Sequence, residues 1–324
     1  KMSQINVEDY GSAVCIDVGS KVVKAGFGGE DSPMAVLPSV TAVPLVKTAA
    51  NKSSYVGDEV IKKRDELKLT WPIQKGLVTD WDLLEKILFH VFYIEVRVGP
   101  EDSPTVLNEP LFNSKQNRER LTEIMFESVS VPAYSTGYDQ VYSLHAAGKT
   151  SGLVLDLGGG YSKSVCIDNG NVVLPTAAQS DICGHHVTTY LQKSIKSGVP
   201  LTEDIVDKIK EEHAYIEYDP QLEKAYRGQY SLPDGTVITL RSEMSECNEY
   251  LFNSTNGIQS LVSKSISAQT GDNQFSVNDL VLTGGLSQTR GLEARLKKEL
   301  QATSIHAPNE RKLGTWLGQS LKSI

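Results

Sequence analysis

The sequence predicts an α/β protein built from two similar lobes. Two apolar hairpins of one design occur at residues 13–27 and 154–167, which indicates an internal duplication. Strand-like and helix-like segments alternate along the rest of the chain, as the layers of an α/β fold require. The chain has 324 residues, 40% of them hydrophobic, and this suits two domains or one large two-lobed domain.

Each predicted hairpin carries an aspartate at the end of its first strand. In "AVCIDVGSKVVKAGF" the apolar runs meet in a turn at residues 19–21, with Asp17 at its mouth. In "VLDLGGGYSKSVCI" Asp156 ends the strand and three glycines follow at residues 158–160. A carboxylate beside backbone without side chains suits a metal-bound phosphate. The alternative is that each aspartate bonds only its own turn.

Helices are predicted where apolar residues recur with helical spacing. "DWDLLEKILFHVFYIEV" (residues 80–96) has Asp80 as its N-cap, and "SKQNRERLTEIMFESV" (residues 114–129) is capped by Ser114 or a neighbouring residue. The predicted strand "PTVLNEP" precedes the second of these helices, so strand and helix alternate here.

The second half of the chain continues the alternation. "PLTEDIVDKIKEEHAYI" predicts a helix with acidic residues in its first turn, and Lys210 and Glu211 fall near the edge of its apolar face. "YSLPDGTVITL" predicts a hairpin that turns at residues 233–235. "DLVLTGGLSQTRGLEARLKKEL" predicts a buried strand, a turn at Gly284 and Gly285, and a helix whose N-terminal amides face whatever occupies the turn.

Charge and composition exclude several classes of function. The net charge is −8 and no basic cluster is longer than residues 62–64, which argues against a broad nucleic-acid interface. The four cysteines are widely spaced without a CxxC pair, which argues against a zinc site or a disulfide framework and indicates a reducing compartment. The start is polar and the longest apolar run is interrupted by His90, so we expect neither signal peptide nor membrane span.

The two hairpin aspartates, taken together, favour nucleotide binding. Asp17 and Asp156 are candidate ligands of a hydrated Mg²⁺ ion, which needs few direct carboxylates when phosphates supply the other ligands. Ser20 can donate to a terminal phosphate, and Lys24 can act on it as a point charge. The structural alternatives are turn aspartates that bond their own backbone and an exposed strand lysine.

Longer strings resemble the actin family, in order and over nearly the whole chain. They include "IDVGSKVVKAGFGGEDSP", "SYVGDE", "GLVTDWDLLEKI", "LPDGTVIT", "LTGGLSQTRGLEARLKKEL" and "APNERKLGTWLG". The wider resemblance is to the superfamily that also holds sugar kinases and the seventy-kilodalton heat-shock chaperones. It implies a bilobed actin-like ATPase fold, with two duplicated α/β domains and a cleft between them for Mg-ATP or Mg-ADP. The first lobe would cover residues 1–150, with an insertion at about 40–75, and the second residues 151–324, with an insertion at about 190–260.

The resemblance also implies a nucleotide site, residue by residue. Asp17 and Asp156 would hold the magnesium ion, mainly through water. The first phosphate loop would consist of Asp17, Gly19, Ser20 and Lys24, and the second of Asp156, Gly158, Gly159 and Gly160. The adenosine contacts would be Gly184, Lys210, Glu211, Gly284, Gly285 and Lys312.

Several residues depart from the family's pattern. Asp139 stands where the family has the glutamine that positions the attacking water, and Gln140 follows it; one residue turns a helical side chain by about 100°, so Gln140 does not simply substitute. Lys163 stands in place of a histidine, Gly159 in place of an acid, and Lys21 in place of a glycine. Because attack by water depends on positioning and electrostatics, we expect slow or absent hydrolysis with binding retained.

The resemblance further predicts that this chain does not polymerise in the ordinary way. The segment between residues 40 and 55 is short and lacks an apolar tip, and the family's apolar loop is missing between "NEYLFN" and "STNGIQSL". We therefore expect a subunit of a larger assembly, cytoskeletal, axonemal, dynein-associated or nuclear, in the cytoplasm and cytoskeleton, with nucleus or cilium as alternatives. The alternatives are a divergent actin that polymerises and hydrolyses ATP, and a kinase of a small sugar-like substrate with Asp139 as its base.

Overall fold

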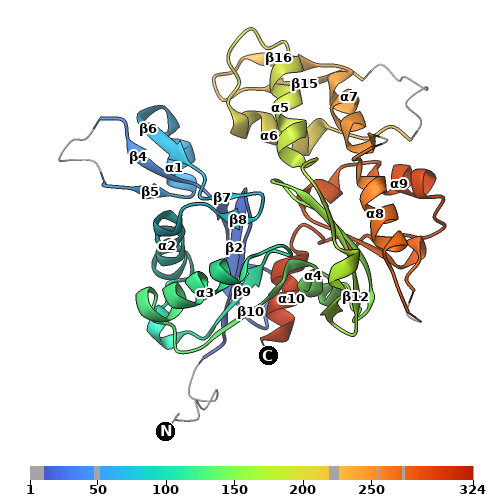
Figure 1. The fold of residues 1–324 in the computed structure, drawn as a ribbon. Helices are drawn as coiled ribbons and strands as arrows, with labels where there is room; N and C mark the ends of the chain where they lie inside the picture. Colours follow the sequence, from blue (N-terminus) through green and yellow to red (C-terminus); the bar gives the residue numbers. More distant parts are fainter. Residues whose placement is uncertain (1–10, 47–51, 219–225, 254, 272–273, 324) are drawn as a thin grey trace. The chain divides into compact units, whose positions relative to one another are not determined.

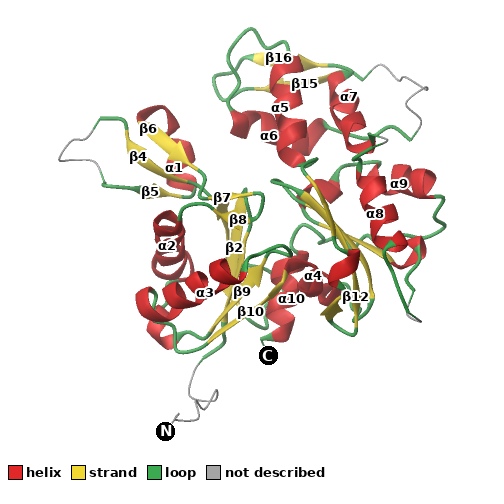
Figure 2. Ribbon diagram, in the orientation of Figure 1, coloured by secondary structure: helices red, strands yellow, loops and turns green. Residues whose placement is uncertain are grey.

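The computed structural model describes residues 11–46, 52–218, 226–253, 255–271 and 274–323, and the chain divides into two compact units (Figure 1). Unit 1 consists of residues 1–149 and 313–324, and unit 2 of residues 150–312. Both units are mixed α/β, and Figure 2 shows strands and helices alternating along each.

Unit 1 is built on a five-stranded sheet with the strand order β10-β9-β1-β2-β3. The central strand β1 is antiparallel to β2 and parallel to β9, and β9 is parallel to β10. This sheet confirms the hairpin predicted at residues 13–27 and the strand predicted in "PTVLNEP". Its strands are β1 (Val14–Val18), β2 (Val22–Phe27), β3 (Ala35–Pro38), β9 (Thr105–Glu109) and β10 (Tyr134–Tyr138).

Side-chain caps fix the start of two helices in unit 1. The Leu83 N–H donates to Asp80 Oδ1 over 3.0 Å, and the Asn117 N–H donates to Ser114 Oγ over 3.1 Å, so both predicted N-caps are confirmed. Each of these helices then continues into a π-helical turn. The elements are α2 (Trp81–His90) followed by η3 (Val91–Val96), and α3 (Lys115–Glu123) followed by η5 (Ile124–Ser128).

The C-terminal helix α10 (Gly314–Lys322) packs in unit 1 against α4 (Asp139–Ala146) and strand β1. Trp316 is fully buried, and its indole N–H donates to the Cys15 carbonyl over 3.0 Å. Gln319 donates to the Ile16 carbonyl over 2.9 Å. The division by contacts therefore differs from the division by sequence, which placed this segment in the second lobe, because α10 covers the central strand of the first sheet.

A small three-stranded sheet with the order β5-β4-β6 lies between strands β3 and β9 in the sequence, and a two-stranded ribbon follows it. Val40, Val60 and Leu67 form its apolar centre. The elements are β4 (Thr41–Pro44), β5 (Tyr55–Val56), α1 (Asp58–Lys62), η2 (Arg64–Glu66), β6 (Leu67–Thr70), β7 (Ile73–Gln74), β8 (Leu77–Val78) and, before β9, η4 (Pro100–Asp102).

The sheet of unit 2 has the same strand pairing as the sheet of unit 1. Its central strand β11 is antiparallel to β12 and parallel to β17, in the order β13-β12-β11-β17, and β14 pairs with β12. The hairpin predicted at residues 154–167 is thus confirmed. The strands are β11 (Gly152–Leu157), β12 (Ser162–Asp168), β13 (Asn171–Val172), β14 (Ala178–Ser180), β17 (Leu280–Thr283) and the separate hairpin β15 (Gly228–Ser231) with β16 (Val237–Leu240).

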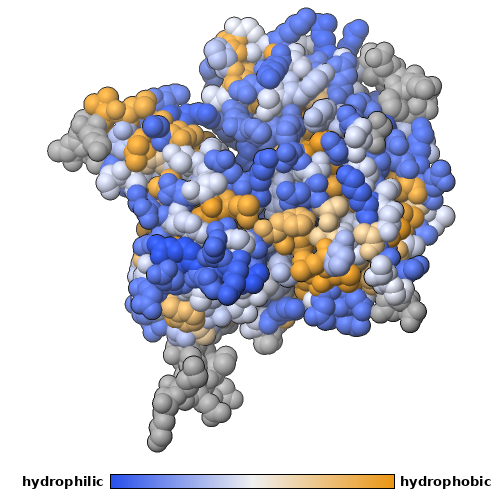
Figure 3. Space-filling view, viewed as in Figure 1, coloured by the Kyte–Doolittle hydropathy of each residue, from blue (hydrophilic) through white to orange (hydrophobic). Residues whose placement is uncertain are grey.

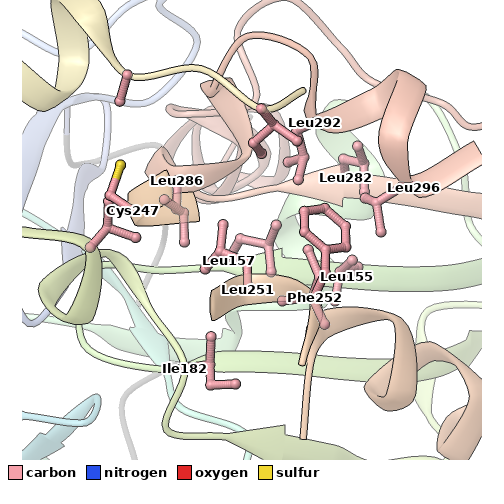
Figure 4. Close-up of a cluster of buried hydrophobic side chains, with 14 of the residues drawn as sticks. Leu155, Leu157, Ile182, Cys247, Leu251, Phe252, Leu282, Leu286, Leu292 and Leu296 are labelled. Atoms are coloured by element: carbon pink, nitrogen blue, oxygen red, sulfur yellow. The ribbon is translucent and has the colours of Figure 1, made fainter. Parts of the chain in front are cut away.

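Helices of unit 2 pack around an apolar core, part of which is drawn in Figure 4. Leu155 and Leu157 of β11 and Leu282 of β17 meet Leu292 and Leu296 of α9 there. The helical elements are α5 (Gly184–Ser194), α6 (Glu203–His213), α7 (Glu243–Glu249), α8 (Ile258–Ser267), α9 (Leu292–Leu300), η6 (Leu174–Thr176), η7 (Tyr250–Phe252), η8 (Val277–Asp279) and η9 (Gly285–Gln288).

One helix begins later than the sequence predicts. The glycine turn after β17 leads into the short 3₁₀ helix η9, and α9 starts only at Leu292. Gly291 precedes it with φ +84°, and a Cβ there would overlap the Ile216 carbonyl. The chain therefore bends a second time, at Gly291, before α9 begins. The backbone amides nearest the turn at Gly284 and Gly285 belong to η9 and not to α9.

The surface view in Figure 3 is largely hydrophilic with separate apolar patches. In the segment expected to lack an apolar tip, Leu45 is 63% and Val46 71% exposed, while residues 47–51 lie outside the described residues. All four cysteines are buried and free. Among the residues that the structure describes, no helix is both long and apolar enough to cross a membrane.

Replacing Gly318 should destabilise unit 1 strongly. A Cβ at this position would overlap the carbonyl group of Tyr142, which is helix backbone and cannot turn away. We expect Gly318→Ala to lower the free energy of unfolding by about 1–3 kcal/mol, as overpacking does. Urea denaturation followed by circular dichroism measures this change.

The matched control is Gly11→Ala, because a Cβ at Gly11 has no atom within 4 Å. Equal stability of the two variants would show that α10 does not pack as closely on α4 as described.

Candidate functional site

The first candidate phosphate loop is the turn between β1 and β2. Asp17 and Lys24 are direct cross-strand partners, and Lys24 Nζ lies 2.5 Å from Asp17 Oδ2. The Gly19 N–H donates to the Val22 carbonyl over 3.1 Å and closes the turn. A Cβ at Gly19 would lie 2.9 Å from that same oxygen, so the turn is this tight only with glycine. The structure thus brings the predicted Asp17, Gly19 and Lys24 together.

Neighbouring segments brace this loop. The Gly76 N–H donates to Ser20 Oγ over 2.8 Å, which leaves the hydroxyl proton of Ser20 available to donate elsewhere. Ser39 Oγ donates to the Gly19 carbonyl over 2.6 Å. Lys21, which stands where the family has a glycine, places its Nζ 5.0 Å from the centre of the Trp71 ring. The substitution at residue 21 therefore leaves the turn intact.

Asn108 is a site residue that the sequence reasoning missed. It ends the apolar part of β9, and β1 and β9 are parallel, so it lies beside the end of β1. The Val18 N–H donates to its Oδ1 over 2.6 Å, and its Nδ2 donates to Asp139 Oδ1 over 2.8 Å. A polar residue at the end of an apolar strand was the available signal.

The two candidate catalytic residues at the start of α4 lie in confined positions. Asp139 is 9% exposed and accepts the hydrogen bond from Asn108. Gln140 is completely buried. Asp139 is thus tied to β9 at the N-terminus of a helix, where a carboxylate is stabilised by the helix dipole, and Gln140 faces the interior.

The second candidate loop repeats the first. Asp156 and Lys163 are direct cross-strand partners, as Asp17 and Lys24 are, and Lys163 Nζ lies 3.6 Å from Asp156 Oδ2. The Gly158 N–H donates to the Tyr161 carbonyl over 3.1 Å. A Cβ at Gly158 would lie 2.8 Å from that oxygen. The two turns therefore share their register, their closing hydrogen bond and their need for glycine.

Backbone from two other elements packs onto the second loop. The Gly184 N–H, at the start of α5, donates to the Gly158 carbonyl over 3.0 Å, and the His185 N–H donates to the Gly159 carbonyl over 2.9 Å. Gly284 follows β17 with φ +88°, and a Cβ there would lie 2.7 Å from Asp156 Oδ1 and overlap the Leu157 carbonyl. Gly160 is half-buried in the turn itself.

The remaining predicted adenosine contacts are Lys210, Glu211 and Lys312, all of them in unit 2. Lys210 donates to Thr188 Oγ1 over 2.7 Å and to Asp207 Oδ1 over 2.5 Å, so its ammonium group joins α5 to α6. Lys312 and Glu211 are exposed and form an ion pair at 3.4 Å. The helix predicted around Lys210 and Glu211 is confirmed as α6, while Lys210 has a structural role that the sequence did not indicate.

Cys183 adjoins the loop as the N-cap of α5, a position where cysteines can be reactive. Its side chain is 1% exposed, and burial raises the pKa of the thiol. The thiol therefore stays protonated at neutral pH, and this cysteine is part of the packing. Within the described ranges, no group of three or more histidine, cysteine or acidic residues is arranged to hold a metal ion.

The residues of both loops fit a phosphate-bearing ligand. In each unit, a carboxylate and an ammonium group stand at the end of an inner strand of the sheet, beside a turn whose first glycine, Gly19 or Gly158, would bring a Cβ against backbone oxygen. In α/β sheets, ligands bind at the carboxyl ends of the strands, and these loops follow such ends. Asp17 and Asp156 are the side chains that could hold a hydrated divalent cation, each shared with a lysine.

A comparison with protein families agrees with the resemblance seen in the sequence. The family model described as Actin matches the chain over residues 8–203 and again over residues 199–323. The two matches together span residues 8–323, and this confirms both the family resemblance and the actin-like α/β fold expected from it.

Two adjacent glycines offer a sharp test of the second loop. Gly284→Ala should lower the free energy of unfolding by at least about 2 kcal/mol, because alanine disfavours positive φ and its Cβ would press on Leu157 and Asp156. Gly285→Ala should change it by less than about 1 kcal/mol, since a Cβ there has no atom within 4 Å. Denaturation curves of both variants, measured in parallel, decide this; equal losses would contradict the close approach at Gly284.

Proposed function

The chain belongs to the actin family, and from this premise we propose that it binds Mg-ATP or Mg-ADP as a structural ligand and serves as a subunit of a larger cytoskeletal assembly, with weak or absent hydrolysis. The observation that carries the binding proposal is the repeated hairpin. In both units an aspartate and a lysine face each other across a glycine turn in identical register.

The proposed binding uses the residues of both loops. A bound Mg²⁺ ion would supply positive charge next to the phosphates and hold its own water shell against Asp17 and Asp156. Lys24 would add a fixed positive charge, and the Ser20 hydroxyl, whose oxygen already accepts from Gly76, would donate its proton.

In the second loop, Gly158, Gly159 and Gly160 would let the phosphates approach the backbone closely, as would Gly284. The exposed pair of Glu211 and Lys312 offers one acceptor and one donor for the polar groups of a nucleoside.

The proposal of weak hydrolysis rests on the start of α4. Hydrolysis of a bound triphosphate requires a side chain that orients water in line with the terminal phosphate. Gln140 is completely buried, and Asp139 is held by Asn108 with its carboxylate in the field of the helix. A carboxylate near phosphates also repels them, so Asp139 does not replace the neutral amide that the family resemblance expects. Gln140 carries such an amide, but it is buried.

The proposed assembly is one with other protein subunits, cytoskeletal, axonemal, dynein-associated or nuclear, with the cytoplasm and cytoskeleton as the proposed location. No direct nucleic-acid partner is proposed, in keeping with the net charge of −8. The second candidate function is that of a divergent actin that polymerises, and the exposed Leu45 and Val46 near residues 47–51 are the observation in its favour.

Nucleotide binding should appear as stabilisation of the folded chain. ATP with Mg²⁺ at a hundred times its Kd should raise the free energy of unfolding by about 2.7 kcal/mol, measured as an increase in Tm. Asp156→Asn should reduce this increase. Asp168→Asn, at the far end of β12, removes a carboxylate from the same hairpin and should leave it unchanged.

Phosphate release and sedimentation at high protein concentration separate the two candidate functions. We expect both to be negligible, whereas appreciable phosphate release together with sedimenting polymer would favour the polymerising actin. If the wild-type chain gains no stability from ATP or ADP, the binding proposal itself is wrong.

A further inference from the structure

We propose that Lys163 is an internal counter-ion of Asp156 that lowers the dependence of nucleotide binding by this chain on a divalent cation. This inference rests on the proposed function, since it concerns how the same site meets the charge of the phosphates. Lys163 stands where the family resemblance expects a histidine, and in this structure it forms an ion pair with Asp156.

Lys163 is a buried charge. Only 1% of the residue is exposed, and it is among the largest fully buried side chains of the described residues. A buried ammonium group is costly unless it is paired. Its Nζ lies 3.6 Å from Asp156 Oδ2 and 4.2 Å from the centre of the Tyr161 ring, whose face also attracts a cation.

The position of Lys163 follows from strand register. It is the direct cross-strand partner of Asp156, just as Lys24 is the partner of Asp17 in the first hairpin. In each hairpin the lysine therefore lies beside its aspartate, on the same face of the sheet. Lys24 is the more accessible of the two, with 13% of its side chain exposed against 2% for Lys163.

The two oxygens of Asp156 lie in different surroundings. Oδ2 is next to Lys163, while Oδ1 lies so close to Gly284 that a Cβ there would be 2.7 Å away. The carboxylate is thus fixed by backbone on one side and neutralised on the other. Its net attraction for a second cation is reduced, because Lys163 repels any ion that approaches it.

The charge balance of the two hairpins leads to the same conclusion. Two aspartates without lysines would repel a triphosphate, and a divalent cation would be needed to join them. Lys24 is paired with Asp17 in the first hairpin, and Lys163 is paired with Asp156 in the second, so each carboxylate already has a positive partner. A phosphate group can then approach the glycine turn of the second loop beside Lys163 with less need of Mg²⁺.

The test is the ratio of the Kd for ATP in EDTA to the Kd in excess MgCl₂, measured by isothermal titration calorimetry on the whole chain. For the wild-type chain we expect a ratio of about ten or less. Lys163→Met keeps the length and apolar stem of the side chain but removes its charge, and should raise the ratio by at least about tenfold. Lys163→His should do the same, and serves if the methionine variant does not fold.

The control is Lys297→Met, which removes one surface lysine of unit 2 from its ion pair with Glu293 and should leave the ratio unchanged. Circular dichroism shows whether each variant is folded. Binding in both buffers with a ratio that Lys163→Met and Lys163→His leave unchanged overturns this inference alone, as does a wild-type ratio above about a thousand. If the wild-type chain binds ATP in neither buffer, the proposed function fails, and the inference fails with it.

Discussion

The register of two antiparallel hairpins is the constraint on which both candidate phosphate loops depend. In each hairpin the glycine turn fixes the pairing, and this pairing sets an aspartate opposite a lysine seven residues later in the chain. A slip of one residue would place the lysine on the opposite face of the sheet from the aspartate. The closing hydrogen bond at Gly19 and at Gly158, 3.1 Å long in both cases, prevents that slip.

The other strands of each sheet place further polar residues and glycines next to the two loops. Because β9 is parallel to β1, and β17 to β11, the polar ends of these strands gather at one edge. This arrangement brings Asn108 next to Val18 in unit 1 and Gly284 next to Asp156 in unit 2. Glycine at residue 284 is then required by backbone contact, whatever ligand the site takes.

The same geometry is compatible with the proposed function, in which an actin-like framework would bind nucleotide without hydrolysing it. Loops that hold phosphates need register, glycine and fixed charge, and both units have them. Hydrolysis needs one further side chain in one orientation, and here that part of α4 carries an aspartate held by Asn108 followed by a buried glutamine. The proposed loss of hydrolysis would therefore require no change in the fold.

The sequence by itself determined the local features: both hairpins, the caps at Asp80 and Ser114, helix α6 and the family. These depend on residues near each other in the chain, and periodicity and turn residues report on them directly. Only the tertiary structure decided that Lys210 joins two helices, that α10 packs on β1, that α9 starts after a second bend, and that Lys163 is buried beside Asp156. Each of these depends on contacts between segments brought together by strand pairing and packing, and no local pattern in the sequence encodes which distant backbone or charge a side chain will meet.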